Sequence, residues 1–256
     1  MMIAPKFLIV CGDGVNCENE TAHAFELAQA KAKIVHINDL LTSPNIVNSY
    51  QGIAFPGGFS FADDLGSGQI MALKIKYGLG ENLEKFIQGK KPVIGICNGF
   101  QILVKLGLLP DISGIRCMAL APNENGTFIN RWVNVIVEPK TKCIWTSNMK
   151  ELDLPVRNGE GRVVFTQGKE RFYYDELKSN GQIALRYSPE DNNGSYERIA
   201  GVCDRYGLIF GLMPHPEAIT TNLTHSVHST DRKRMLRSGI GLTLFENAVE
   251  YLKNCY

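Results

Sequence analysis

The stretch VIGICNGFQ, residues 93–101, decides the fold of this chain. Its first four residues are apolar, as in a strand buried in a core, and from residue 101 onward QILVKLGLL spaces its apolar side chains like a helix. Asn98 and Gly99 lie between these two patterns and are typical of a turn. The stretch therefore predicts a buried strand, an abrupt turn and a helix, with Cys97 at the apex of the turn.

The same alternation of short strands and helices runs through the first hundred residues. Apolar runs at 6–11, 33–37 and 52–55 predict three more strands, and residues 22–32 and 69–87 have helical spacing. Short, mostly apolar strands that alternate with helices are typical of a parallel sheet covered on both faces. We therefore expect an α/β fold with a mostly parallel central sheet and helices on both of its faces.

The second half of the chain has a different pattern. Residues 131–137 alternate polar and apolar side chains, as expected of a strand with one exposed face. Further strand patterns, with turns between them and little helix, lie at 162–165, 182–187, 199–203 and 208–212. This pattern predicts a smaller antiparallel or mixed sheet beside the first, followed by a helix near residues 241–253. Because no linker or internal repeat interrupts the chain, we expect a single domain over residues 1–256.

Composition and charge exclude several classes of function. The 256 residues are 44% hydrophobic and 21% charged, with a formal net charge of +1, which gives no field to attract nucleic acid or an anionic membrane. Seven cysteines, an odd number, favour reduced thiols over a disulfide framework. The apolar run at 7–11 is too short for a signal-peptide core or a membrane span. We expect a soluble, cytoplasmic protein that binds neither nucleic acid nor membranes.

A cysteine at a strand-to-helix elbow has a chemical logic. The sharp turn raises the side chain above the sheet edge, and the flanking glycines, Gly95 and Gly99, let the backbone take an unusual conformation. The free N–H groups at the start of the helix stabilise a thiolate and the oxyanion of an attacked carbonyl. The pattern G-x-C-x-G is therefore the thiol version of the hydrolase elbow G-x-S-x-G, although a pattern this short also occurs by chance.

A thiol nucleophile needs a base, and the base needs a group that orients it. Of the five histidines, His23 and His36 lie in expected elements and His225 and His228 in a polar stretch. His215 differs, because it follows an apolar strand in the stretch GLMPHPE, residues 211–217. Prolines on both sides favour an extended backbone, in which residues two apart face the same side.

In that geometry Glu217 can reach one ring nitrogen of His215 and leave the other for Cys97. The same seven residues are equally compatible with a plain turn after a strand that carries an exposed histidine. Sequence spacing alone does not decide between the two interpretations.

A third stretch, FPGGFS at residues 55–60, also follows a strand. Two glycines at a strand end allow backbone N–H groups to face an anion. The stretch could form a phosphate cradle, although it lacks the lysine and spacing of the P-loop. It could also be a plain turn, or it could complete an oxyanion hole with the N–H of Asn98.

Other residues that could carry chemistry are better explained as structural. Asp63 and Asp64 are adjacent, with no histidine nearby, so we expect a solvated turn. Cys11 and Cys17 lack the C-x-x-C spacing of zinc and redox sites, so we expect core thiols. We predict no metal site in this chain.

Three motifs together resemble the class I, triad-type glutamine amidotransferases. They are GICNGFQ at 95–101, PGGF at 56–59 and HPE at 215–217, in the order in which the family has them. The resemblance implies a flavodoxin-like core and hydrolysis of the side-chain amide of L-glutamine to glutamate and ammonia. It further implies that Cys97 is the nucleophile, His215 the general base and acid, and Glu217 the residue that orients the histidine.

The resemblance also implies roles for the loop and the elbow helix. The oxyanion and substrate site would involve residues Gly57, Gly58, Phe59, Asn98 and Gln101. The N–H of Gly58 or Phe59 would act with the N–H of Asn98 on the oxyanion. Gln101 would help to hold the substrate, or would be a buried amide of the elbow helix.

Further stretches are similar to one branch of this family, the glutaminase subunits of phosphoribosylformylglycinamidine synthase. They are NCE at 16–18, PGGFSFADDLGSG at 56–68 and LPVRNGEGR at 154–162. The branch implies a separate synthetase subunit as partner, in many organisms with a small third subunit. No ATP-binding motif is recognisable in this chain, so we expect no cofactor here and ATP and Mg²⁺ on the synthetase.

One residue departs from that branch. Asn158 stands where the family commonly has histidine before Gly-Glu-Gly, which bears on coupling to the synthetase and leaves the triad unchanged. Two alternatives remain open at this point. The chain could serve another amidotransferase pathway, or it could be an idle regulatory or scaffolding homologue.

Overall fold

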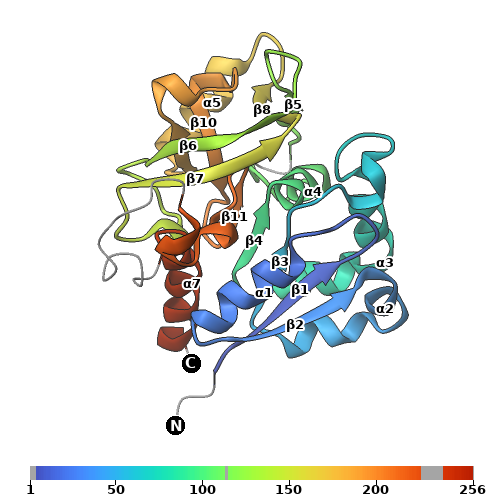
Figure 1. Ribbon diagram of the computed structural model, residues 1–256. Helices are drawn as coiled ribbons and strands as arrows, with labels where there is room; N and C mark the ends of the chain where they lie inside the picture. The colour runs from blue at the N-terminus through green and yellow to red at the C-terminus, as the bar shows by residue number, and fades with distance from the viewer. Residues whose placement is uncertain (1–3, 113–114, 226–238, 256) are drawn as a thin grey trace.

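The computed structural model describes residues 4–112, 115–225 and 239–255, and its centre is a nine-stranded mixed sheet (Figure 1). In spatial order the strands are β2 (Lys31–His36), β1 (Lys6–Cys11), β3 (Gly52–Phe55), β4 (Val93–Ile96), β11 (Ile209–Leu212), β10 (Ile199–Cys203), β9 (Ile183–Tyr187), β6 (Ile129–Val137) and β7 (Glu151–Asn158). The pairs from β2 to β11 are parallel, and the pairs from β11 to β7 are antiparallel. Strands β10 and β6 therefore run opposite to the others.

Helices cover both faces of the parallel strands, as the sequence predicts. They are α1 (Glu18–Leu27), α2 (Ile37–Thr42), α3 (Gln69–Gln88), α4 (Asn98–Leu106) and α7 (Leu242–Cys255), with α5 (Glu170–Ser179) in the second half. On one face the ring of Phe25 in α1 stacks on the ring of Phe7, with 3.9 Å between their centroids. It also meets the ring of Phe245 in α7 edge-on, with 4.9 Å between centroids. This aromatic cluster joins the two helices to β1.

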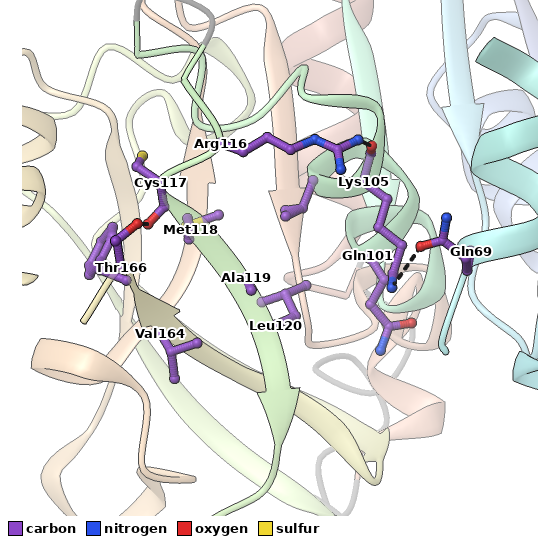
Figure 2. A pocket seen from close by; sticks show the side chains of 12 residues that line it. Gln69, Gln101, Lys105, Arg116, Cys117, Met118, Ala119, Leu120, Val164 and Thr166 are labelled. Atoms are coloured by element: carbon purple, nitrogen blue, oxygen red, sulfur yellow. Dashed lines mark hydrogen bonds between the residues drawn. The ribbon is translucent and has the colours of Figure 1, made fainter. Parts of the chain in front are cut away.

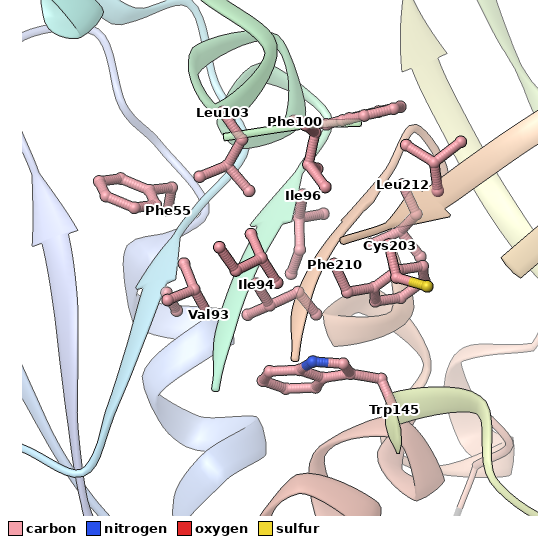
Figure 3. Packing of buried hydrophobic residues seen from close by; sticks show 14 of the residues in the cluster. Phe55, Val93, Ile94, Ile96, Phe100, Leu103, Trp145, Cys203, Phe210 and Leu212 are labelled. Atoms are coloured by element: carbon pink, nitrogen blue, oxygen red, sulfur yellow. The ribbon is translucent and has the colours of Figure 1, made fainter. Parts of the chain in front are cut away.

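Helix α4 packs on the opposite face. Figure 3 shows Phe100 and Leu103 reaching from α4 toward the sheet, with Phe55 and Ile96 beside them. All four side chains are buried at 3% exposure or less. Since α4 follows β4 directly, this packing fixes the direction in which the helix leaves the strand.

The second half of the chain differs from the prediction that its strands form a separate sheet. The strands at 182–187, 199–203 and 208–212, with 131–137, do not form a separate sheet but extend the central one. The smaller antiparallel sheet exists, and contains β5 (Met118–Pro122) and β8 (Glu160–Phe165). Alternating side chains show that a strand has two unlike faces, but they do not say which strand edge it pairs with. The predicted fold class itself is confirmed.

The parallel pairing decides where a site can form. Strands β1, β3, β4 and β11 are neighbours that point the same way, so their carboxyl ends lie at one edge of the sheet. Ligand sites in open α/β sheets form outside this edge. The segments after these strands carry Cys17, Gly58, Cys97 and His215. None of the helices in the described ranges combines the length and the hydropathy of a membrane-spanning segment.

Candidate active site

Cys97 occupies a strained elbow between β4 and α4. Its backbone has φ 51° and ψ −105°, a region that residues with side chains rarely adopt. Its N–H donates to the carbonyl of Leu212 at 2.8 Å, and its own carbonyl accepts from the N–H of Gln101 at 3.2 Å. The residue is thus bonded both to the sheet and to the helix, and the surrounding structure holds a conformation that costs roughly 1–3 kcal/mol.

Gly99 makes this elbow possible. A Cβ atom at residue 99 would lie 1.8 Å from the carbonyl oxygen of Phe55, because the first turn of α4 presses against the end of β3. No side chain fits in that space. The G-x-C-x-G pattern therefore has a structural cause: the helix must start close to the sheet for its free N–H groups to surround the thiol.

His215 and Glu217 form a buried hydrogen-bonded pair. The ring atom Nδ1 of His215 lies 2.6 Å from Oε1 of Glu217, and the residues are 3% and 4% exposed. The backbone N–H of His215 donates to the carbonyl of Pro155 at 2.9 Å, which anchors the segment to β7. The interpretation of residues 211–217 as a plain turn with an exposed histidine is therefore wrong for this chain.

The ring of His215 lies among groups that favour its charged form. Burial lowers the pKa of His215, but the Glu217 carboxylate and the sulfur atoms of Cys97 and Cys17 raise it, and the net pKa is well above that of an ordinary histidine. Within the described part of the chain, Nε2 of His215 and Oε2 of Glu217 are buried atoms with no hydrogen-bond partner. The second ring nitrogen is thus left for a group that arrives at the site.

The loop after β3 offers one backbone donor. Residues 15 and 58 form an isolated antiparallel bridge flanked by two bonds, from Phe59 N–H to the carbonyl of Gly14 at 2.8 Å and from Asn16 N–H to the carbonyl of Gly57 at 3.3 Å. In this pattern the N–H of Gly58 points away from the bridge. The N–H of Phe59 is already used. Of the two donors that the sequence left open, Gly58 is the one that can face an oxyanion.

Gly58 cannot be replaced by another residue without strain. Its φ is +145°, and a Cβ atom there would lie 2.8 Å from backbone atoms of Gly14 and Asn16.

The side chains of Asn98 and Gln101 are occupied in a network that ties the elbow to the loop at Asp63 and to the start of β8. Nδ2 of Asn98 donates to Oε1 of Gln101 at 2.9 Å and to Oδ1 of Asp63 at 3.1 Å. Nε2 of Gln101 donates to the carbonyl of Glu160 at 2.7 Å. These bonds favour the second of the two interpretations for Gln101, a buried amide of the elbow helix.

Comparison with known proteins agrees with this geometry. Residues 4–252 match the family described as CobB/CobQ-like glutamine amidotransferase domain. A curated relative, the phosphoribosylformylglycinamidine synthase subunit PurQ of Methanococcus maripaludis, is 41% identical over 97% of this chain and 98% of the relative. The subunit of the same name from Dehalococcoides mccartyi is 38% identical over 97% of this chain and 98% of its own length. The chain belongs to the PurQ family of glutamine amidotransferases.

Solved structures extend the comparison. A chain from the structure of PurLQS from Thermotoga maritima has a TM-score of 0.75 and 32% identity, over 98% of this chain and all of that one. A second glutamine amidotransferase from Thermotoga maritima has a TM-score of 0.58 with 14% identity, over 98% of this chain and 99% of that one, and so shows a shared fold alone. Membership of the PurQ family makes this chain a glutamine amidotransferase with the predicted α/β fold.

Two residues of this PurQ-family chain lie elsewhere than the sequence predicts. Cys17 is not a core thiol: it is half-buried, and its Sγ lies within 4.8 Å of a His215 nitrogen and a Glu217 oxygen. Asp63 is not fully solvated, because Asn98 binds it. Burial raises the pKa of Asp63, while hydrogen bonds from Gly68, Ser67 and Asn98 oppose the shift. The position of Cys17 after a parallel strand was the signal that could have revealed it.

Asn158 has a structural role in this chain. The residue is buried, its Nδ2 donates to Oδ1 of Asn123 at 3.2 Å, and its carbonyl accepts from Nδ2 of Asn123 at 2.7 Å. This pair ties the end of β7 to the turn that precedes β6. The departure from the histidine of the family is therefore accommodated by a local amide pair.

Two of the remaining histidines contact residues that are not part of this site. His36 accepts a hydrogen bond from the N–H of Asn38, and the ring of His225 lies 4.7 Å from that of Trp132. His228 is outside the described residues.

A cavity of about 390 Å³ lies between α4 and the β5–β8 sheet (Figure 2). Gln101 and Lys105 line it from the helix, and Arg116 and Met118 from the other side. Cys97 and His215 are not among its lining residues. Gln101, one turn after Cys97, thus contributes to the wall of this cavity as well as to the network under the elbow.

Proposed function

We propose that this chain is the glutaminase subunit of a phosphoribosylformylglycinamidine synthase, and that Cys97, His215 and Glu217 are its catalytic triad. The observation that carries the proposal is the buried His215–Glu217 pair, whose free Nε2 faces a site shared with the thiol at the start of α4. A thiol, a base and an orienting carboxylate are the parts that nucleophilic catalysis at an amide requires.

The reaction begins when the sulfur of Cys97 attacks the side-chain amide carbon of glutamine. His215 takes the thiol proton at Nε2, and Glu217 stabilises the imidazolium through Nδ1. The raised pKa of His215 suits this step, because the ring must hold a proton once the sulfur is anionic or bonded to carbon.

Charge then develops on the amide oxygen. The N–H groups of Gly58 and Asn98 are the donors that can stabilise it, with the positive end of α4 beside them. His215 next gives its proton to the departing nitrogen, which leaves as ammonia. A water molecule, activated by the same imidazole, hydrolyses the thioester and releases glutamate.

Gly57 and Phe59 contribute to stabilising the oxyanion indirectly, because their backbone hydrogen bonds fix the conformation of the loop. Gly57 accepts from two backbone N–H groups, those of Asn16 and Cys17, and Phe59 donates to Gly14. These bonds hold the N–H of Gly58 in place.

The ammonia released by this chain would be used by a partner subunit. The PurQ name of the relatives and the PurLQS structure support a synthetase subunit and a small third subunit as partners of this chain. The synthetase would bind ATP and Mg²⁺ and convert formylglycinamide ribonucleotide to its amidine. We place this assembly in the cytoplasm and treat the chain as one domain, since the family match spans residues 4–252.

Replacing the nucleophile tests the proposal. In the reconstituted complex, Cys97→Ala should abolish glutamine-dependent amidine formation and leave ammonia-dependent formation intact, because the synthetase site is untouched. Cys255→Ala, at an exposed thiol near the end of α7, is the matched control and should retain both activities. Survival of glutamine-dependent activity in Cys97→Ala would contradict the assignment.

A further inference from the structure

The active site contains a second thiol that the glutaminase reaction does not need. Cys17 lies at the start of α1, after the turn that follows β1. Its Sγ, a ring nitrogen of His215 and a carboxylate oxygen of Glu217 lie within 4.8 Å of one another. The three residues come from segments almost two hundred positions apart, which the parallel sheet brings to one edge.

Sulfur, imidazole nitrogen and carboxylate oxygen together are a ligand set for a thiophilic divalent cation. Zn²⁺ binds these three types of atom at about 2.0–2.3 Å, and three protein ligands with one open position are a common arrangement. Ligand atoms around such an ion are separated by roughly 3.3–3.7 Å. The His215–Glu217 hydrogen bond, 2.6 Å long, would open by about 1 Å and the sulfur would move inward, so small side-chain movements can close the three groups around an ion.

Two further features favour a cation over a purely apolar filling of this space. Oε2 of Glu217 is buried and has no hydrogen-bond partner among the described residues. Burying polar atoms without partners is costly, and a metal ion satisfies such atoms. The charges also match once the ion has displaced the protons of the thiol and the ring, since a thiolate and a carboxylate then balance a divalent ion.

The site has an entry from solvent. His215 and Glu217 are buried, but Cys17 is partly exposed, and its thiol donates to Oδ1 of Asn16 at 3.2 Å, at the surface. An arriving ion would displace the thiol proton and bind first to the sulfur. The two buried ligands would then complete its coordination.

We propose that Cys17, His215 and Glu217 form an inhibitory binding site for a thiophilic divalent cation, with Zn²⁺ as the expected ligand. An ion shared with Glu217 lies on the Nδ1 side of the ring, where it takes the orienting carboxylate away and adds positive charge, so Nε2 becomes a poor acceptor for the proton of Cys97. The inhibition rests on the function proposed above, whereas the binding itself does not. Cys17 is a ligand for the ion and forms no bond with glutamine.

Cobalt spectroscopy on the full chain tests the binding. Co²⁺ alone, added to the reduced protein, should give the visible bands of a tetrahedral ion and a thiolate-to-cobalt charge-transfer band at one ion per chain. Zn²⁺ alone should displace the cobalt and should inhibit glutamine hydrolysis in the complex with the synthetase. In Cys17→Ser the charge-transfer band should disappear, and the Zn²⁺ concentration for half-inhibition should rise at least about tenfold, measured against the metal-free activity of that variant.

Two other cysteine variants make the outcome specific. Cys255→Ser should behave like the unchanged chain. Cys97→Ser should lose glutaminase activity but keep the charge-transfer band, because the band comes from Cys17.

A band that persists in Cys17→Ser, or is absent from the unchanged chain, overturns the metal site. A Cys97→Ser variant that still hydrolyses glutamine would instead overturn the proposed function, and the cobalt bands would still decide the metal site.

Discussion

Glu217 sets the charge that the buried ring of His215 can carry. Its carboxylate stabilises the imidazolium through a 2.6 Å charge-assisted bond, whereas an amide of the same shape can accept the bond but has no negative charge. We expect Glu217→Gln to lower kcat/KM for glutamine by about 10²–10⁴-fold, the range by which positioned acid–base groups accelerate reactions. Steady-state kinetics with glutamine in the reconstituted complex measures the loss.

The control for this variant is Glu160→Gln, which removes a different, partly buried carboxylate near the elbow. Its side chain interacts with Lys105 and Ser67 and does not touch His215, so the variant should retain most of the activity. Equal losses in the two variants would show that Glu217 acts through stability and not through the histidine.

Burial makes Cys117 an inert thiol. Its residue is 1% exposed, and burial raises the pKa of its thiol to about 11. At pH 8 only about one thiol in a thousand is then ionised, and the thiolate is the reactive form. We expect iodoacetamide to modify the exposed Cys255 within minutes and to leave Cys117 unmodified until the chain is unfolded, as read by peptide mass spectrometry. Rapid labelling of Cys117 in the native chain would contradict its burial.

Residue-level prediction from the sequence succeeds where neighbours in the chain define the geometry. Two prolines and a spacing of two residues indicated that Glu217 can reach the ring of His215, although they did not exclude an exposed histidine in a plain turn. The position of Cys17 was predicted wrongly because its partners are almost two hundred residues away in the sequence. Spacing rules for metal motifs apply only to ligands that are close together in the sequence. The second donor of the oxyanion site also stayed open, because a bridge between residues 15 and 58 decides it.

At the scale of elements, the turn between β10 and β11 depends on one buried carboxylate. Oδ1 of Asp204 accepts the N–H groups of Leu208 at 2.7 Å and Ile209 at 3.0 Å. We expect Asp204→Ala to reduce the free energy of unfolding by roughly 1–3 kcal/mol, because two buried donors lose their acceptor. Asp204→Asn keeps Oδ1 and should cost less, as measured by urea denaturation.

The pH dependence of stability in the unchanged chain and in Asp204→Asn provides a second check. Burial raises the pKa of Asp204 above its ordinary value of 3.8, so the native state keeps the proton at a pH where the unfolded chain has lost it. The stability of the unchanged chain should therefore fall, relative to Asp204→Asn, as pH rises from the ordinary to the raised pKa. Parallel pH profiles for the two chains would exclude this contribution.

The sequence predicts the elements of this molecule better than their pairing. The strand at 93–96 and the helix after Cys97 follow from local patterns, and so does the parallel arrangement of the first strands. Whether the strands of the second half extend the central sheet depends on hydrogen bonds between β10 and β11. The local pattern of polar and apolar residues does not predict these bonds. The chain could be assigned to its fold class without that knowledge.

At the scale of the whole molecule, the elbow at Cys97 is connected to a loop with a strained backbone, residues 61–65. Phe61, Ala62, Asp63 and Leu65 all have positive φ, between 54° and 61°, a conformation unfavourable for residues other than glycine. Asp63 in this loop is hydrogen-bonded to Asn98, which follows Cys97, and Leu65 is 82% exposed. Strained backbone of this kind occurs at switch regions, where a partner can shift the balance between two conformations. The loop is thus suited to pass a signal from a bound partner to the thiol.

We therefore expect the isolated chain to hydrolyse glutamine weakly and the synthetase subunit to raise its turnover several-fold. Asp63→Ala removes the acceptor that couples the loop to Asn98, so it should reduce this stimulation more than it reduces the basal rate. Asp64→Ala changes the adjacent, exposed residue and is the matched control, with stimulation retained. Glutamate formation measured with and without the synthetase gives both rates for each variant. If Asp63→Ala and Asp64→Ala are stimulated equally, the signal reaches Cys97 by another route, and if the unchanged chain shows no stimulation, it acts as an independent amidase.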